Sequence, residues 1–160
     1  MSAIIRNFAE NDIALFRNVV ARSIYELCAG SYSKQELDAW FHQYPADTIY
    51  RNWIETRVLL VAVAENQVVG FAQFHPEIAV IEAMHVLPEF TRRGIGTTLV
   101  RHLETQASQK GLSTVDVEAS TNAEQFYLQC GYTKIRDGKF KCRNGIELNS
   151  ILLRKQLNVG

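Results

Sequence analysis

The sequence LPEFTRRGIGTTLV, residues 87–100, holds two glycines, Gly94 and Gly96, between a pair of arginines and the start of a helical apolar repeat. Glycine disfavours helix interiors, but it lets the backbone approach a ligand closely because it has no Cβ atom. The first N–H groups of a helix have no intrahelical acceptor and carry a partial positive charge. A strand that leads into this turn therefore predicts an anion site at the start of a helix over residues 94–110.

Other phosphate-binding loops fit these residues less well. The P-loop requires a lysine after its last glycine, whereas Thr97 follows Gly96 here. The dinucleotide fingerprint GxGxxG requires a third small residue, and Leu99 stands at that position. A GxG pair alone is also compatible with a helix that tolerates glycine for close packing. The choice between an anion site and a packing role therefore depends on the rest of the chain.

The periodicity of apolar residues predicts a mixed α/β domain. The predicted elements are, in chain order, a strand at 3–8, helices at 11–28, from 33 and from 47, strands at 57–64, 68–74 and 78–87, a helix at 94–110, a strand at 114–119, a helix ending at 131, and strands at 132–140 and 146–153. The strand–helix–strand unit over 78–119 requires at least one parallel pair, and the other connections favour antiparallel pairing. We expect one domain over residues 1–160, with a mainly antiparallel sheet of six to seven strands flanked by helices.

Three local signals give sharper predictions. Ser33 and Glu36 fit a capping box at a helix start. Gly70 inside a strand indicates a bulge or close packing. The dipeptide Asn144-Gly145 predicts a type I′ turn between the last two strands.

Composition excludes several classes of function. The 160 residues include 17 basic and 17 acidic side chains, so broad binding to nucleic acid or to an anionic membrane is not expected. The three cysteines are odd in number and form no CxxC pair, which argues against a disulfide framework or a zinc site. No apolar run approaches the roughly 18 residues of a membrane span, and the start is not leader-like, which favours a cytoplasmic protein. No resident metal is expected.

Two motifs resemble those of one enzyme family. The segment VLPEFTRRGIGTTLVRHLETQA (86–107) resembles the acetyl-CoA-binding motif of the GCN5-related N-acetyltransferases (GNAT family), in which V-x-P precedes [QR]-x-x-G-x-[GA] and an amphipathic helix. The segment VEASTNAEQFYLQCGY (117–132) is similar to the family's strand followed by N-A-x-x-F-Y-x-x-x-G-[FY]. The resemblance covers essentially the whole chain and implies the GNAT fold. Thr91 departs from the family's Gln or Arg, so no side-chain role is carried over to it.

The resemblance implies acetyl-CoA as the co-substrate and assigns residues to it. The N–H groups that would hold its pyrophosphate are those of Arg93, Gly94, Ile95, Gly96 and Thr97, with the side chains of Arg92 and Arg93 as accessories. The family also has a bulge that splays the strand before the loop. The backbone that would then pair with the pantetheine arm is that of Met84, His85 and Val86, and Asn122 matches a residue that hydrogen-bonds the arm.

Two side chains are candidates for the transfer itself. Tyr127 matches the family's tyrosine that protonates the departing sulfur, and a phenol of pKa near 10 can donate to a thiolate whose conjugate acid has a pKa near 8.5. Glu82 stands in the otherwise apolar strand AVIEAMHV, where many relatives carry an acid that accepts the amine's proton. His85 and water alone stay open as bases; strand alternation predicts that His85 points to the opposite face from Glu82.

The segment after the first strand walls the acceptor pocket in this family. Here it is rich in aromatic and acidic residues: Tyr25, Tyr32, Trp40, Tyr44, Tyr50 and Trp53, with Asp38, Asp47 and Glu55. These side chains can receive a cationic amine through cation–π and charge contacts, or they can form core. A small amine, an amino acid, a peptide N-terminus and a lysine all stay open as acceptors.

The sequence therefore predicts an N-acetyltransferase that moves an acetyl group from acetyl-CoA to a small-molecule or peptide amine by direct transfer in a ternary complex. The alternative is a non-catalytic acyl-CoA-binding or regulatory module. The terminal hairpin over 132–153 offers strands that can pair in a homodimer, and a monomer fits equally well.

Overall fold

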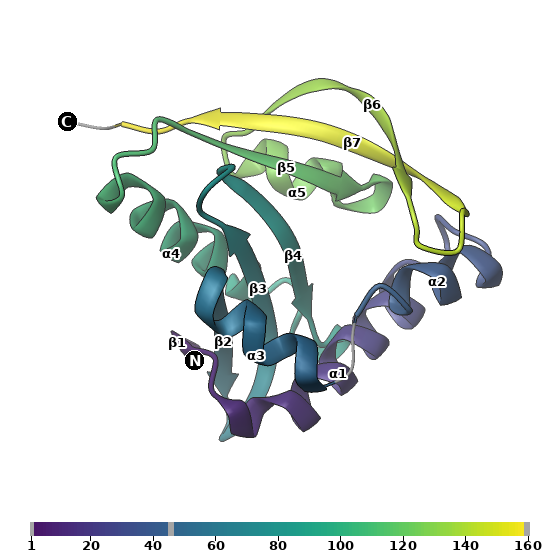
Figure 1. Ribbon diagram of the computed structural model, residues 1–160, viewed down its shortest axis with the longest axis horizontal. Helices are drawn as coiled ribbons and strands as arrows, with labels where there is room; N and C mark the ends of the chain where they lie inside the picture. Colours follow the sequence, from purple (N-terminus) through teal and green to yellow (C-terminus); the bar gives the residue numbers. More distant parts are fainter. Residues whose placement is uncertain (1, 45–46, 159–160) are drawn as a thin grey trace.

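Seven strands form one mixed sheet in the order β1-β2-β3-β4-β5-β7-β6 (Figure 1). The computed structural model describes residues 2–44 and 47–158, without the side chains of residues 47–50. The elements are β1 (Ile4–Asn7), α1 (Ile13–Arg22), α2 (Lys34–Phe41), α3 (Asp47–Thr56), β2 (Val58–Ala64), β3 (Gln67–His75), β4 (Val80–Val86), α4 (Ile95–Gln109), β5 (Thr114–Ser120), α5 (Glu124–Gln129), β6 (Thr133–Lys141) and β7 (Glu147–Gln156). The predicted mainly antiparallel sheet with flanking helices is confirmed, because β4–β5 is the only parallel pair among the described strands.

Helices α1 and α4 cover opposite faces of β3. Phe16 of α1 packs on Phe71, with ring centroids 4.9 Å apart. The neighbouring Gly70 faces the other way, where a Cβ atom would lie 3.2 Å from Leu99 Cδ1 of α4. Alternation along β3 therefore divides the core into an α1 face and an α4 face. No helix in the described parts of the chain combines the length and apolar character of a membrane span.

Both predictions for Gly70 hold. The register of β2 and β3 passes from Ala62↔Gly70 to Val63↔Val68, so Val69 is an extra residue in β3. A Cβ atom at Gly70 would also lie 3.3 Å from the Cβ of Ala62. The glycine therefore serves a bulge and a close helix–sheet contact together.

The predicted capping box at α2 is confirmed. The Glu36 N–H donates to Ser33 Oγ at 3.2 Å, and the Ser33 N–H donates to Glu36 Oε1 at 2.9 Å. These two bonds satisfy N–H groups that a helix start leaves without partners.

The predicted type I′ turn is wrong. Gly145 has a φ of 88°, but Asn144 has no positive φ, whereas a type I′ turn requires it at both residues. The Gly145 N–H donates to the Cys142 carbonyl at 2.9 Å, so the turn begins two residues earlier than Asn144. The Asn144 side chain accepts from the Ile146 N–H at 3.1 Å, which is the bond of an Asx turn.

Strands β4 and β5 pair over only a short length and then diverge (Figure 1). Their paired positions are Val80↔Asp116 and Ile81↔Val117. On its other edge, β4 pairs with β3 through Phe74↔Ile81 and Gln73↔Ala83, which leaves Glu82 as an extra residue. Because a bulge bends its strand, Glu82 marks the point where β4 turns away from β5.

Candidate active site

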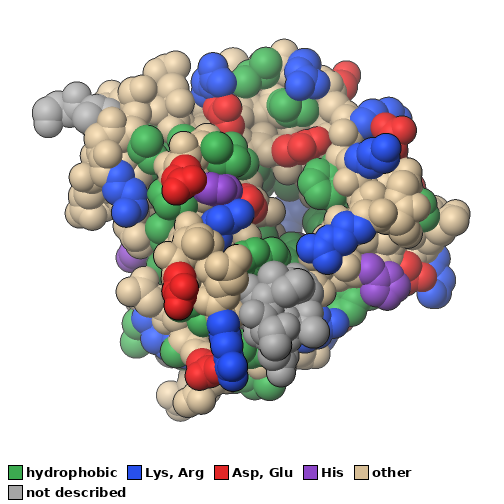
Figure 2. All heavy atoms as spheres, in the orientation of Figure 1, with side chains coloured by type: hydrophobic (Ala, Val, Ile, Leu, Met, Phe, Trp, Pro, Cys, Tyr) green, Lys and Arg blue, Asp and Glu red, His purple; other side chains and the backbone are tan. Residues whose placement is uncertain are grey.

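A cavity of about 1070 Å³ opens where β4 and β5 diverge. Figure 2 shows it as a hollow at the centre of the molecule. Its lining comes from β4, β5, β7, the start of α4, the residues around α5, and the segment from Ser23 to Trp53. The two sequence motifs and the aromatic segment therefore meet at one place.

The start of α4 lies in this cavity with its N–H groups uncapped by a side chain. Gly94 is the N-cap residue with a φ of 81°, and its carbonyl accepts from the Thr98 N–H at 3.0 Å. The N–H groups of Ile95, Gly96 and Thr97 precede the first intrahelical bond and therefore carry the anion-binding character of a helix start. Gly94 supplies the left-handed conformation that this turn needs.

Gly96 serves a different purpose, which is space. A Cβ atom at this position would lie 3.0 Å from Phe126 Cε1 of α5. Phe126 also lines the cavity. Gly96 therefore allows α4 and α5 to meet beside the uncapped N–H groups.

The two arginines before the glycines differ in direction. Arg92 lines the cavity and has a φ of 61°, an unusual conformation for a residue with a side chain. The Arg93 guanidinium instead lies 4.7 Å from the centroid of the Phe90 ring and 4.0 Å from Glu65. Thr91 Oγ1 donates to the Pro88 carbonyl at 2.8 Å, so this side chain closes the preceding turn.

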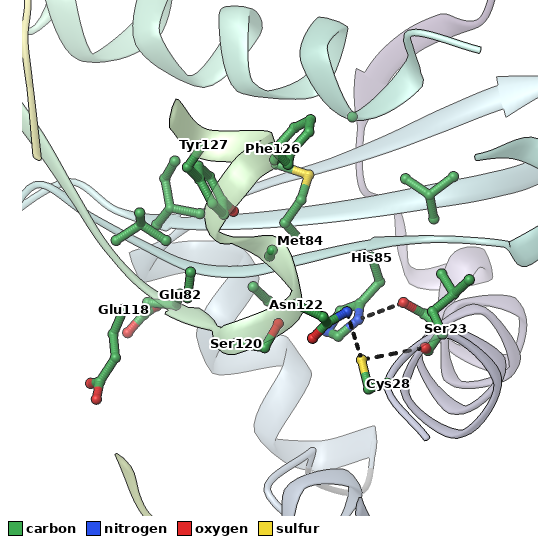
Figure 3. Close-up of a pocket in the computed structure, with 18 of the residues that line it drawn as sticks. Ser23, Cys28, Glu82, Met84, His85, Glu118, Ser120, Asn122, Phe126 and Tyr127 are labelled. Carbon is green, nitrogen blue, oxygen red and sulfur yellow. Dashed lines mark hydrogen bonds between the residues drawn. The ribbon is translucent and has the colours of Figure 1, made fainter. Parts of the chain in front are cut away.

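The three β4 residues predicted to offer their backbone lie along the diverging edge. Val86, His85 and Met84 pair with β3 on one side. Within the described part of the chain, β4 has no strand partner on the β5 side beyond Ile81. All three line the cavity. Figure 3 shows Met84 directed toward Phe126 and His85 directed toward Ser23.

His85 is a buried imidazole with hydrogen bonds at both ring nitrogens. Nε2 lies 2.5 Å from Tyr44 Oη, and Nδ1 lies 3.2 Å from Ser23 Oγ. Burial lowers the pKa of His85 from 6.5 to about 3. The ring is therefore neutral at physiological pH and is a poor acceptor for an additional proton.

This burial predicts an acid-sensitive fold. Since the folded-state pKa is about 3 and the ordinary value is 6.5, the unfolded chain binds a proton at His85 below about pH 6.5 while the folded chain does not. The free energy of unfolding should then fall by up to roughly 1.4 kcal/mol per pH unit through this interval, with no contribution from His85 above it. Denaturant titrations at pH 7 and pH 5 measure the difference. His85→Gln should reduce it, and an equal difference in the variant would contradict the assignment.

Glu82 lies on the same face of β4 as His85, so the expectation of opposite faces is wrong. Its Oε1 accepts from Gln73 Nε2 at 2.9 Å and from Arg57 Nε at 2.8 Å. Gln73 shares the α1 face with Phe71, whose partner in register is His85. The bulge at Glu82 interrupts the alternation on which the expectation depended.

Tyr127 is buried at the base of the cavity and its hydroxyl points into it (Figure 3). Its ring makes edge contacts with Phe126 and Tyr132, at centroid distances of 5.0 and 5.5 Å. Burial, with a smaller effect from the nearby Cys130, raises the pKa of Tyr127 well above its usual range. The phenol therefore stays protonated and able to donate a hydrogen bond.

Asn122 also lines the cavity, where its Nδ2 lies 3.6 Å from Cys28 Sγ. Burial raises the pKa of Cys28 to about 11, and the bond from Asn122 opposes this in part. The thiol is therefore neutral, so Asn122 donates to a weak acceptor that a better one can replace.

The aromatic segment divides between cavity and core. Its members that line the cavity are Tyr32, Trp40, Tyr44 and Trp53. Tyr25 instead donates to Asp38 at 2.5 Å, and neither residue lines the cavity, nor does Glu55. The side chains of Asp47 and Tyr50 lie outside the described residues.

Sequence reasoning missed Glu118, Gln73 and Ser23, which also line the cavity. Glu118 alternates with buried valines in β5, a pattern that favours a solvent-facing side chain. Only the register Ile81↔Val117 places it across from Glu82. Among residues 2–44 and 47–158, no group of three or more His, Cys, Asp or Glu side chains is arranged to hold a metal ion.

Comparisons with known proteins agree with this fold. The model of the acetyltransferase (GNAT) domain matches residues 28–151. The uncharacterized N-acetyltransferase YafP of Escherichia coli (strain K12) is 26% identical over 139 residues, which are 87% of each chain.

Solved structures give the same answer. A GCN5-related N-acetyltransferase from Rhodopseudomonas palustris has a TM-score of 0.91 and 27% identity, and the match covers 98% of this chain and 97% of that one. The PaiA N-acetyltransferase from Thermoplasma acidophilum, solved in complex with coenzyme A, has a TM-score of 0.77 and 20% identity over 98% and 99% of the two chains.

The seven-stranded mixed sheet, in which the parallel strands β4 and β5 diverge, is the fold of the matched acetyltransferase structure. The chain belongs to the GNAT family of acetyltransferases and is an N-acetyltransferase by class.

Proposed function

We propose that this enzyme transfers the acetyl group of acetyl-CoA directly to an amine held in the same cavity. The observation that carries the proposal is that the uncapped start of α4, the free edge of β4, Tyr127 and Glu82 all line one cavity. The Thermoplasma relative, which was solved with coenzyme A, supports the choice of co-substrate.

The donor half of the cavity suits a pyrophosphate and an extended arm. Several N–H groups at the start of α4 converge on one point, and hydrogen bonds to a charged group contribute about 1.5–3 kcal/mol each. Arg92 adds a cation at this end, whereas Arg93 contributes through its backbone because its side chain lies on Phe90. The free edge of β4 and the Asn122 amide offer polar groups to the arm, and bound acetyl-CoA supplies the activated thioester.

Two side chains carry the proton chemistry in this proposal. Glu82 accepts the proton of the amine. Among the described residues, Arg57 and Gln73 both donate to its Oε1, which leaves Oε2 for the proton. Tyr127 donates to the departing sulfur. Its raised pKa favours a hydrogen bond to the thiolate over complete proton transfer.

Glu82→Gln should lower kcat about tenfold or more, with the Kd for acetyl-CoA within about twofold, because the amide cannot take a proton. Release of CoA thiol across a panel of amines measures kcat, and calorimetry measures Kd. Since Gln can still accept from Arg57, the fold should persist. An unchanged kcat would exclude Glu82 as the base, and His85 would not replace it because it is buried with both ring nitrogens engaged.

The compartment, the domain boundaries and the oligomeric state are further predictions. A cytoplasmic location and a single domain over residues 1–160 stay predictions of the sequence. A homodimer formed through the terminal hairpin would have to pair through β6, which is the edge strand of the sheet. The nine residues of β6 include four basic ones, Lys134, Arg136, Lys139 and Lys141. Basic side chains along an edge discourage strand pairing, so the monomer is favoured.

A further inference from the structure

The charged side chains that line the cavity are separated by sign. Among the lining residues that the structure describes, Arg92 is the only lysine or arginine, and it follows the end of β4. The carboxylates are those of Glu82, near the start of β4, and Glu118 on β5. The donor end is therefore positive and the acceptor end negative.

The strand register brings the two carboxylates to one face of the sheet. Glu82 and Glu118 each follow one member of the last parallel pair, Ile81↔Val117. Residues that follow paired positions in neighbouring strands point to the same side. Figure 3 shows both side chains at the same end of the cavity.

The two carboxylates differ in their partners. Glu82 forms an ion pair with Arg57 at 2.8 Å, so its charge is balanced. Glu118 Oε2 accepts from the neutral Ser150 Oγ at 2.6 Å, and no Lys, Arg or His of the described chain lies within ion-pair distance of it. Glu118 is therefore the unbalanced charge of the acceptor end.

A second observation also indicates a ligand that donates hydrogen bonds. Gln73 is 4% exposed and lines the cavity, and its Oε1 has no donor in the described part of the chain. Its Nε2 is occupied by Glu82, which fixes the orientation of the amide. An amide oxygen without a donor therefore lies next to the carboxylates at the acceptor end.

Aromatic rings complete this end. Trp40, Tyr44 and Trp53 line the cavity on the helical side, and such rings attract a cation that lies over their faces. Carboxylate oxygens, an amide oxygen and aromatic faces all favour a positively charged group, and none of them favours an anion.

We propose that the acceptor is a small cationic amine with no carboxylate beside its nitrogen, and that Glu118 is the side chain that recognises its charge. This inference rests on the proposed acetyl transfer. An amino acid with a free α-carboxylate would bring a like charge against Glu118, which is unfavourable. Glu118 acts here in substrate selection, whereas Glu82 accepts the proton.

Two matched substrate series test the proposal on the wild-type enzyme. Tyrosine, tyrosinamide and tyramine differ in the α-substituent alone, as do arginine, argininamide and agmatine; the amides keep the size of a carboxylate without its charge. CoA release should give a kcat/KM about tenfold or more higher for the amides and amines than for the acids. Acids that react as fast as their amides would overturn the proposal. No CoA release from any of the six compounds would instead overturn the proposed acetyl transfer, and the two failures are therefore distinguishable.

A variant of Glu118 tests whether this side chain causes the preference for amides over acids. Glu118→Gln keeps an acceptor for Ser150 but removes the charge, so the amide-over-acid ratio should shrink at least about threefold and KM for agmatine should rise about threefold, with kcat little changed. Glu77→Gln, on the exposed turn before β4, removes a carboxylate outside the cavity and should leave the ratio unchanged. Because the same substrates are compared in both enzymes, their intrinsic reactivity does not affect this comparison. An unaltered amide-over-acid ratio in Glu118→Gln would show that Glu118 does not recognise the substrate charge.

Discussion

Replacing Tyr127 by Phe is expected to lower kcat about 100-fold while the Kd for acetyl-CoA stays within about twofold. The phenol hydroxyl points into the cavity from a buried ring, and burial keeps it protonated. Its loss leaves the departing thiolate without this hydrogen-bond donor. The ring contacts with Phe126 and Tyr132 do not involve the hydroxyl, so the fold should be retained.

Tyr132→Phe is the matched control for this experiment. Tyr132 is buried beside Tyr127, but its hydroxyl donates to Glu104 at 2.9 Å and it does not line the cavity. This variant should lose some stability and keep its kcat. If Tyr127→Phe turned over at the wild-type rate, Tyr127 would be a packing residue and the sulfur would need another donor.

Gly96→Val is expected to weaken acetyl-CoA binding about 100-fold, whereas Arg92→Ala should weaken it about fivefold or less. A Cβ atom at Gly96 would meet the Phe126 ring at 3.0 Å, so the valine must displace either that ring or the first turn of α4. Several N–H groups would then lose their common point of convergence. Arg92 is exposed, and a single exposed charge contact is worth only about 0–1 kcal/mol.

Calorimetry with acetyl-CoA gives the order of the two effects, and Gly30→Val supplies the control. Gly30 has an ordinary φ and nothing within 4 Å of the position where its Cβ would lie, so this substitution adds the same side chain without a clash. It also lies outside the cavity lining. A larger loss for Arg92→Ala than for Gly96→Val would show that side-chain charge, and not the backbone, holds the donor.

Local sequence patterns were sufficient to predict much of this structure. Apolar periodicity predicted the order of the elements, and the Ser33–Glu36 pair predicted its own hydrogen bonds, because these features depend on residues close in sequence. The GxG turn was ambiguous alone and became informative only with the second motif. Gly94 and Gly96 then proved to have separate purposes, one conformational and one steric.

What the sequence could not predict depends on register between distant segments. The predicted face of His85 was wrong because one bulged residue interrupts the alternation of β4. Glu118 looked like an ordinary surface residue until the Ile81↔Val117 pair placed it beside the cavity. The Tyr44–His85 hydrogen bond joins residues 41 positions apart in the sequence, and no local sequence pattern predicts it.

The bulge in β4 also has a consequence for how this site can change over generations. Glu82 is supernumerary: Ile81 and Ala83 already pair with adjacent residues of β3, so a chain lacking position 82 would keep both halves of β4 in their present register. Gain or loss of a single codon would therefore add or remove the carboxylate together with the bend that parts β4 from β5. A substitution at position 82 changes only the side chain offered to the substrate. A deletion removes the carboxylate and the bend of β4 in one step.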